Sequence, residues 1–216
     1  VFGEVVQGFD VVEQVEATKT GEQDRPVLEC KIVECGQLTA DEYREWVGAD
    51  AAPDFPADDT APDECLRLAL AIKDAGNQLF KAGSFLRAIG KYNKARRYLD
   101  KYVGDDAGDR RRMFDDTVAT LQLNSVACHN KLQDWESAAT VAQVLLDKRP
   151  SAKAHFRMAQ AQLGKKEFEK AQQHLGKAAE LDPEDQTIPK ELARVKRLQA
   201  EEEKKTKDLY ARMFSR

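Results

Sequence analysis

A spacing of 33 residues between matching small residues and prolines constrains the fold of this chain more than any other feature. Ala138 and Pro150 are matched at that interval by Ala171 and Pro183. From Cys65 onward, the intervening sequence favours helices, with apolar residues three and four apart. A fixed period of this size is typical of repeated supersecondary units that bury their apolar faces against their neighbours. We therefore predict a stack of helix pairs.

An earlier copy of the pattern, with Gly76, Ala88 and Tyr92, lies 50 residues before the Ala138 copy. Large aromatic residues recur near the turn inside each predicted pair, at Phe85, Trp135 and Phe168. Small residues recur where two paired helices would touch, at Gly76, Ala88, Ala95, Ala127, Ala138, Ala159, Ala171 and Ala178. These positions resemble the tetratricopeptide repeat, a helix-turn-helix unit of about 34 residues.

Residues 1–38 have a different pattern. Two β-favouring stretches, residues 2–6 and 27–35, flank a capping box made by Asp10 and Glu13 that predicts a short helix. We therefore expect a β-α-β segment at the start of the chain.

Residues 39–66 are acidic and rich in proline. Nine acidic residues lie between positions 41 and 64, against Arg44 as the one basic residue. This composition is typical of a linker. The parts predicted after it are the repeats at 67–185, with units of about 69–102, 119–151 and 152–185, and an extension helix at 186–216.

The extension predicts one long helix with two possible roles. Apolar residues spaced to cover the open end of a repeat array are Ile188, Leu192, Val195 and Leu198. The extension also holds nine basic and five acidic residues. It is either a solvated capping helix or a basic amphipathic helix that binds calmodulin or a membrane surface. The predicted fold class is mainly α, a three-repeat helical solenoid with a C-terminal capping helix, preceded by the β-α-β segment.

Composition excludes several functional classes. No apolar run approaches the roughly 18 residues of a membrane span. A net charge of −4 does not indicate a nucleic-acid-binding protein. The cysteines, Cys30, Cys35, Cys65 and Cys128, lack a framework spacing. They indicate free thiols in a reducing compartment, the cytoplasm or also the nucleus, and not a zinc site. We expect no cofactor and no catalytic residue, and we interpret His129, His155 and His174 as packing or surface residues.

Five polar or cationic residues fall at corresponding points in the first helix of each predicted pair. They are Lys73, Asn77, Asn124, Lys153 and Arg157. Lys153 and Arg157 are i, i+4 neighbours, a like-charge pair that costs a helix about 0.2–0.5 kcal/mol. Such a local conflict is often retained at a functional site. Stacked repeats would gather the five into a basic groove for a C-terminal Asp, which offers two carboxylates. The alternative is that they are ordinary residues of solvated helix faces.

The same five positions resemble the carboxylate clamp of tetratricopeptide co-chaperones, over residues 65 to 183. Those proteins bind the Met-Glu-Glu-Val-Asp tail of heat-shock protein 90, and related clamps accept a heat-shock protein 70 tail. The resemblance implies that Lys73, Asn77 and Asn124 surround the terminal Asp. Lys153 and Arg157 would reach its side chain and neighbouring groups. It predicts a chaperone-binding adaptor that assists protein folding.

The first residues, VFGEVVQGFDVVEQVE, resemble the closing segment of cyclophilins, which ends here near Cys35-Gly-Gln-Leu38. Together with the linker, the repeats and the closing Tyr210-Ala-Arg-Met-Phe214, they resemble the cyclophilin 40 type of peptidyl-prolyl cis-trans isomerase. In that family the catalytic residues precede the VFG segment. We therefore expect residues 1–38 to be a remnant of a cyclophilin β-barrel without isomerase activity. The alternative is an isomerase that is active only in a full-length form.

Overall fold

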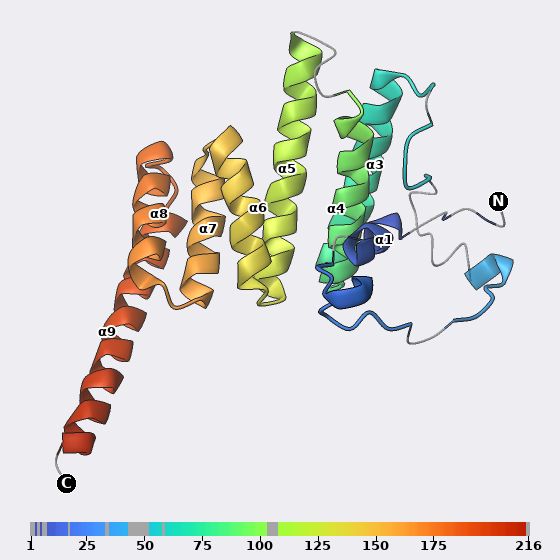
Figure 1. The fold of residues 1–216 in the computed structure, drawn as a ribbon. Helices are drawn as coiled ribbons and strands as arrows, with labels where there is room; N and C mark the ends of the chain where they lie inside the picture. The colour runs from blue at the N-terminus through green and yellow to red at the C-terminus, as the bar shows by residue number, and fades with distance from the viewer. Residues whose placement is uncertain are drawn as a thin grey trace. The chain divides into compact units, whose positions relative to one another are not determined.

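The chain forms two compact units, Val1–Leu121 and Gln122–Arg216 (Figure 1). The computed structural model describes residues 8–16, 18–32, 35–42, 52–57, 59–102 and 108–214, together with Gly3 and Val5. The helices of the first unit are α1 (Phe9–Glu16), η1 (Glu22–Asp24), α3 (Pro62–Lys81) and α4 (Phe85–Asp100). Helix α5 (Asp109–Lys131) crosses the boundary. The second unit continues with α6 (Trp135–Lys148), α7 (Ala152–Gly164), α8 (Phe168–Leu181) and α9 (Thr187–Phe214).

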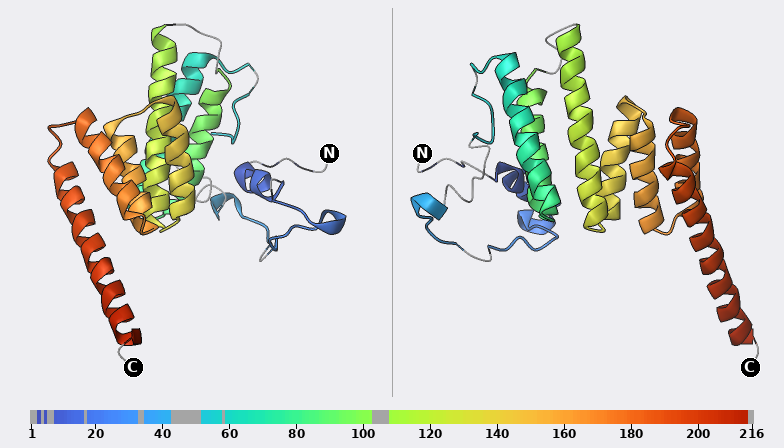
Figure 2. Two further views of the ribbon diagram at one scale, coloured as in Figure 1. Left: turned by 60° about the vertical axis from the view of Figure 1, so that its left-hand side comes forward. Right: turned by 180° about the vertical axis from the view of Figure 1, so that it is seen from behind.

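Helices α3 and α4 form a hairpin in the first unit, and both views of Figure 2 show them side by side. Pro62 and Asp63 begin α3, because the fixed φ of proline suits a first turn and an acidic residue suits the positive end of the helix dipole. Gly83 follows α3 with a φ of 77°, a left-handed conformation that glycine adopts without strain. Gly76 allows close packing, since a Cβ there would lie 2.7 Å from Cε1 of Tyr92.

The turns inside three helix pairs share one backbone geometry at the spacing of the sequence repeat. Gly83, Gln133 and Lys166 have φ values of 77°, 59° and 60°. The N–H of the residue after each one donates to a carbonyl five residues earlier. The second helices then begin at the aromatic residues predicted near these turns, Phe85, Trp135 and Phe168. All eight small residues predicted at helix contacts are buried, so the helical-repeat prediction is confirmed.

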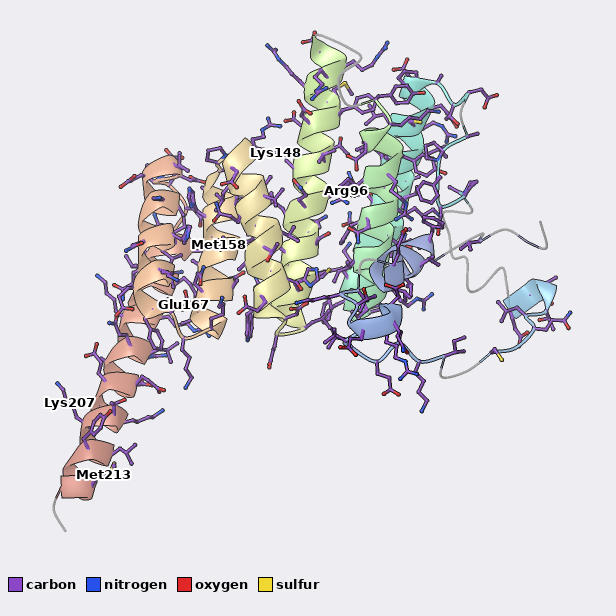
Figure 3. The ribbon with its side chains drawn as sticks, in the orientation of Figure 1. Arg96, Lys148, Met158, Glu167, Lys207 and Met213 are labelled. Carbon is purple, nitrogen blue, oxygen red and sulfur yellow. The ribbon has the colours of Figure 1, made fainter. Side chains whose placement is uncertain are left out.

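In the second unit, α7 packs against α6 and α8, and α8 packs against α9. Its core contains Ala159, Ala171, Leu175, Ala178, Ile188 and Val195. Ile188 and Val195 thus cover α8, as predicted for a capping helix. Figure 3 shows Lys207 and Met213 on the far end of α9, where Met213 is exposed. No helix in the described ranges is both long and apolar enough to cross a membrane.

The predicted β-α-β segment is only partly present. Its helix exists as α1, but no strand occurs in the described part of residues 1–38, apart from an isolated bridge between Thr20 and Pro26. Val27, Leu28 and Ile32 are exposed, so the strand prediction over 27–35 is wrong for the described residues. A strand needs a neighbouring strand to pair its backbone groups, and among the described residues of this segment the bridge is the one such pairing. The stretch 2–6 lies mostly outside the described residues.

Candidate functional site

Lys73 and Asn77 lie one turn apart on α3, and both are half-buried. The Nζ atom of Lys73 lies 4.0 Å from the carboxylate of Asp74. The hydroxyl of Tyr92 on α4 donates to Oδ1 of Asn77 over 2.9 Å. Since Tyr92 is buried, this bond fixes the orientation of the Asn77 amide. The Nδ2 atom of Asn77 therefore lies on the other side of the amide, where it donates to Oδ1 of Asp74 over 3.4 Å.

Asn124, Lys153 and Arg157 belong to the second unit. Asn124 is half-buried on α5, Lys153 is exposed in the first turn of α7, and Arg157 is half-buried one turn later. Hydrogen bonds from Thr187, followed by the charge of Lys153, lower the pKa of Asp185. Lys153 therefore already contributes a positive field at this end of α7.

Arg157 is a half-buried cation, and no carboxylate in the described part of the chain pairs with it. Its Nη1 donates to Oε1 of Gln160 over 3.0 Å, and its carbonyl accepts from Nδ2 of Asn130 over 3.1 Å. Burial lowers the pKa of the guanidinium, which nevertheless remains protonated at neutral pH. None of the described carboxylates forms an ion pair with it. A charge withdrawn from water in this way favours an anionic ligand.

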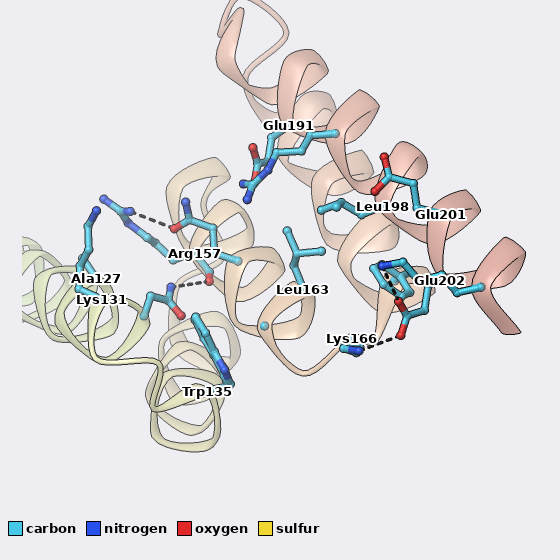
Figure 4. Close-up of a pocket in the computed structure, with 16 residues that line it drawn as sticks. Ala127, Lys131, Trp135, Arg157, Leu163, Lys166, Glu191, Leu198, Glu201 and Glu202 are labelled. Atoms are coloured by element: carbon cyan, nitrogen blue, oxygen red, sulfur yellow. Dashed lines mark hydrogen bonds and ion pairs between the residues drawn. The ribbon is translucent and has the colours of Figure 1, made fainter. Parts of the chain in front are cut away.

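A cavity of about 680 Å³ opens beside Arg157 within the second unit (Figure 4). Residues of α5, α7 and α9 line it, together with the first residues of α6 and α8 and with Lys166 in the turn that follows α7. Its apolar lining consists of Ala127, Trp135, Leu163, Phe168 and Leu198. Figure 4 shows Leu163 of α7 and Leu198 of α9, which both line the cavity. The cavity can therefore accept an apolar group next to a charged one.

The charges around the cavity are unevenly neutralised. Its basic lining residues are Lys131, Arg157, Lys166, Arg194 and Lys205, and its acidic ones are Glu191, Glu201 and Glu202. Arg194 pairs with Glu191 at 2.7 Å, and Lys166 pairs with Glu202 at 2.7 Å. Among the residues that the structure describes, Lys131 and Arg157 have no such partner. The wall formed by α5 and α7 thus keeps an uncompensated positive charge.

Asn130 presents an unsatisfied acceptor beside this cavity. Its Oδ1 is buried and receives no hydrogen bond from the described protein atoms. Leaving a buried acceptor unpaired costs about 1–3 kcal/mol.

The structure assigns the five predicted site residues to two units, two on α3 in the first and three in the second. Their assembly into one groove stays a prediction. Asn130 and Gln160 were not identified from the sequence. Gln160 follows Arg157 by three residues and so shares its helix face, a spacing that could have indicated it. The Oδ1 atom of Asn130 is unpaired because of tertiary packing, which no sequence pattern indicates.

The histidines are packing residues in this structure. His155 and His174 place their Nδ1 atoms 3.0 Å apart, and His129 places its Nδ1 3.0 Å from Oδ2 of Asp134. Burial, reinforced by nearby positive charge, lowers the pKa of both His155 and His174. In the described ranges, no three metal-ligating side chains cluster together.

Comparison with known proteins identifies two kinds of segment. The model of the cyclophilin type peptidyl-prolyl cis-trans isomerase matches residues 1–37, and that of the tetratricopeptide repeat matches residues 152–185. Peptidyl-prolyl cis-trans isomerase D of Mycosarcoma maydis is 30% identical over 250 residues. That alignment covers all of this chain and 63% of the relative, so the chain spans less than two thirds of the relative's length.

Solved structures show the same fold for the helical part. The C-terminal TPR-containing domain of an FK506-binding protein from Plasmodium falciparum is 27% identical, with a TM-score of 0.55. The alignment covers 68% of this chain and 97% of that domain. The Hsp90 co-chaperone Cns1 from Saccharomyces cerevisiae is 24% identical, with a TM-score of 0.56. The alignment covers 73% of this chain and 47% of the Cns1 chain. With a cyclophilin match, a tetratricopeptide match and an isomerase 30% identical to it, the chain is similar to tetratricopeptide-containing proteins of the cyclophilin 40 type.

Proposed function

We propose that this chain is a chaperone-binding adaptor that captures an acidic C-terminal peptide, that of heat-shock protein 90, in a carboxylate clamp. The binding residues are Lys73, Asn77, Asn124, Lys153 and Arg157. The heat-shock protein 70 tail is the alternative ligand, and the cytoplasm is the proposed location.

The observation that carries the proposal is the state of Arg157. Its guanidinium is half-buried and charged, and no described carboxylate neutralises it. A planar guanidinium binds a carboxylate through two parallel hydrogen bonds. Lys153 lies one turn away on the same face and adds a point charge. A C-terminal Asp offers one carboxylate to each.

The amide residues complete this chemistry. Tyr92 holds Asn77 with its Nδ2 as the donor side, so a carboxylate oxygen can accept from it without a further buried charge. Cns1, which shares the fold, is an Hsp90 co-chaperone.

Isothermal titration calorimetry of the pentapeptide Met-Glu-Glu-Val-Asp tests the proposal. We expect roughly micromolar affinity, about −8 kcal/mol. Arg157→Ala should weaken binding by about 2 kcal/mol or more, the scale for removing one partner of a desolvated charge pair. Lys196→Ala is the matched control, because Lys196 is an exposed cation of the same unit that does not line the cavity. Equal losses in both variants would show that only net charge matters and would reject the clamp.

A further inference from the structure

Helix α4 carries a stripe of hydrogen-bond donors along one face. The donors are Lys94, Arg97 and Tyr98 of α4, continued by Lys101 and Tyr102 in the turn that follows the helix. Their spacing of i, i+3, i+4, i+7 and i+8 is that of an amphipathic stripe, with polar groups in place of apolar ones. Lys94 and Tyr98 are nevertheless buried, so another segment must cover this face.

The covering segment consists of residues 52–57 with Asp59 and Thr60, which we call the strap. Its carbonyls accept from the α4 stripe along the helix. The pairs are Lys94 with Ala52, Tyr98 with Pro53, Arg97 with Asp54, Lys101 with Ala57 and Tyr102 with Thr60. The Tyr98, Arg97 and Lys101 bonds measure 2.8, 3.0 and 2.6 Å. The strap therefore runs in the same direction as α4.

Asp54 connects this contact to the N-terminal segment. Its side chain is 4% exposed, and its Oδ1 lies 3.8 Å from Nη2 of Arg97. Its Oδ2 accepts the backbone N–H of Phe9, the first residue of α1, over 3.0 Å. The ring of Phe55 stacks on Arg97 at 4.9 Å and meets the edge of Phe9 at 4.9 Å. A buried carboxylate is tolerated only where such partners satisfy it.

We propose that the donor stripe of α4 is an intramolecular docking site for the strap, and that the strap holds the cyclophilin-like segment in one position on the first hairpin. Residues 1–37 match the cyclophilin model, and α1 lies within them. The strap joins α1 to α4, and α4 packs on α3, which carries Lys73 and Asn77. Helix α1 and the hairpin of α3 and α4 then move as one body. This inference does not depend on peptide capture.

Recognition through carbonyls explains how an acidic, proline-rich segment can be ordered. Every residue of an extended strap offers a carbonyl, and prolines cost nothing here because their missing N–H is not needed. Asp54 supplies the specific contact, and the carbonyl bonds supply the register.

Limited proteolysis of the full chain tests the docking. Cleavage of the Asp59–Thr60 bond by endoproteinase Glu-C in phosphate buffer, where the enzyme also accepts aspartate, reports how often the strap leaves α4 when it is followed by mass spectrometry. Arg97→Met, which keeps the aliphatic stem, should accelerate this cut by at least about tenfold. Arg96→Met is the matched control, since Arg96 is 44% exposed against 11% for Arg97 and pairs with Asp100 instead. It should cleave at the wild-type rate.

Two further measurements keep the test independent of any damage to α4. Asp54→Asn leaves the helix untouched and should also accelerate the cut. Spin labels at Val12→Cys on α1 and Arg87→Cys on α4, in a Cys30→Ser and Cys35→Ser background, should give a narrow distance distribution. Arg97→Met should broaden it. Equal cleavage rates in wild type, Arg97→Met and Asp54→Asn, or a broad wild-type distribution, would overturn the proposal.

Discussion

Replacing Gly76 with alanine tests the packing that positions Asn77. The added Cβ would lie 2.7 Å from Cε1 and 3.0 Å from Cδ1 of the Tyr92 ring. The ring is 1% exposed and therefore has no free volume into which to retreat. The backbone of α3 or α4 must shift instead.

The magnitude follows from two opposing effects. Overpacking a core costs about 1–3 kcal/mol, and contacts this short place the cost near the upper end. Alanine is about 1 kcal/mol better than glycine inside a helix. We therefore expect the free energy of unfolding to fall by about 2 kcal/mol. With a typical urea slope of about 2 kcal/mol per molar, the unfolding midpoint should fall by about 1 M.

Urea denaturation followed by circular dichroism measures this shift. Gly176 in α8 is the matched control, because a Cβ there meets no atom within 4 Å. Gly176→Ala should raise the free energy of unfolding by up to about 1 kcal/mol. If Gly76→Ala proves as stable as Gly176→Ala, the close approach of α3 to Tyr92 is wrong.

Three other perturbations probe separate features. Tyr92→Phe removes the hydroxyl that orients Asn77, so calorimetry should show roughly threefold to tenfold weaker peptide binding; unchanged affinity contradicts the positioning role. Burial lowers the pKa of His155 and His174 below the ordinary 6.5, so the unfolded chain binds more protons in acid. The contribution of the two histidines to the free energy of unfolding should be fully present above about pH 6.5 and should be lost as the pH falls through the folded pKa. A urea midpoint that stays constant over this pH range would refute this. Gln133→Gly relieves a left-handed φ of 59° and should add about 0.5–1 kcal/mol to the free energy of unfolding; a lower midpoint contradicts it.

The helix pairs could be predicted from the sequence because their constraint is local and repeated. A small residue is required wherever two helices cross closely, so Ala88, Ala138 and Ala171 recur at the repeat spacing, and each is fully buried. The aromatic residues that begin the second helices follow the same spacing. Repetition made a weak signal at each position into a strong one.

The docked strap could not be predicted in this way. Its acidic, proline-rich composition indicated a linker, because composition does not report the donors on another helix. The donors themselves are lysine, arginine and tyrosine, which hydrophobic patterning assigns to a solvated face. A search for donors at helical spacing would have found Lys94, Arg97 and Lys101.

The cavity beside Arg157 was also only partly predictable. Arg157 was identified from its place in the repeat, and Gln160 shares its face of α7. Another part of the lining comes from α9, for which the sequence predicts either a capping helix or a basic amphipathic helix that binds calmodulin or a membrane surface. Leu198 lines the cavity, whereas Ile188 and Val195 are in the core. One helix thus covers the last repeat and also shapes the cavity, a combination set by tertiary packing.

Peptide capture is tested most directly by the C-terminal carboxylate itself. Calorimetry should compare Met-Glu-Glu-Val-Asp with the same peptide amidated at its C-terminus. We predict roughly micromolar affinity for the free acid. The amide should bind at least about tenfold more weakly, because it leaves the desolvated cationic side chains without one anionic partner. Equal affinity of the two peptides would contradict a carboxylate clamp in this chain.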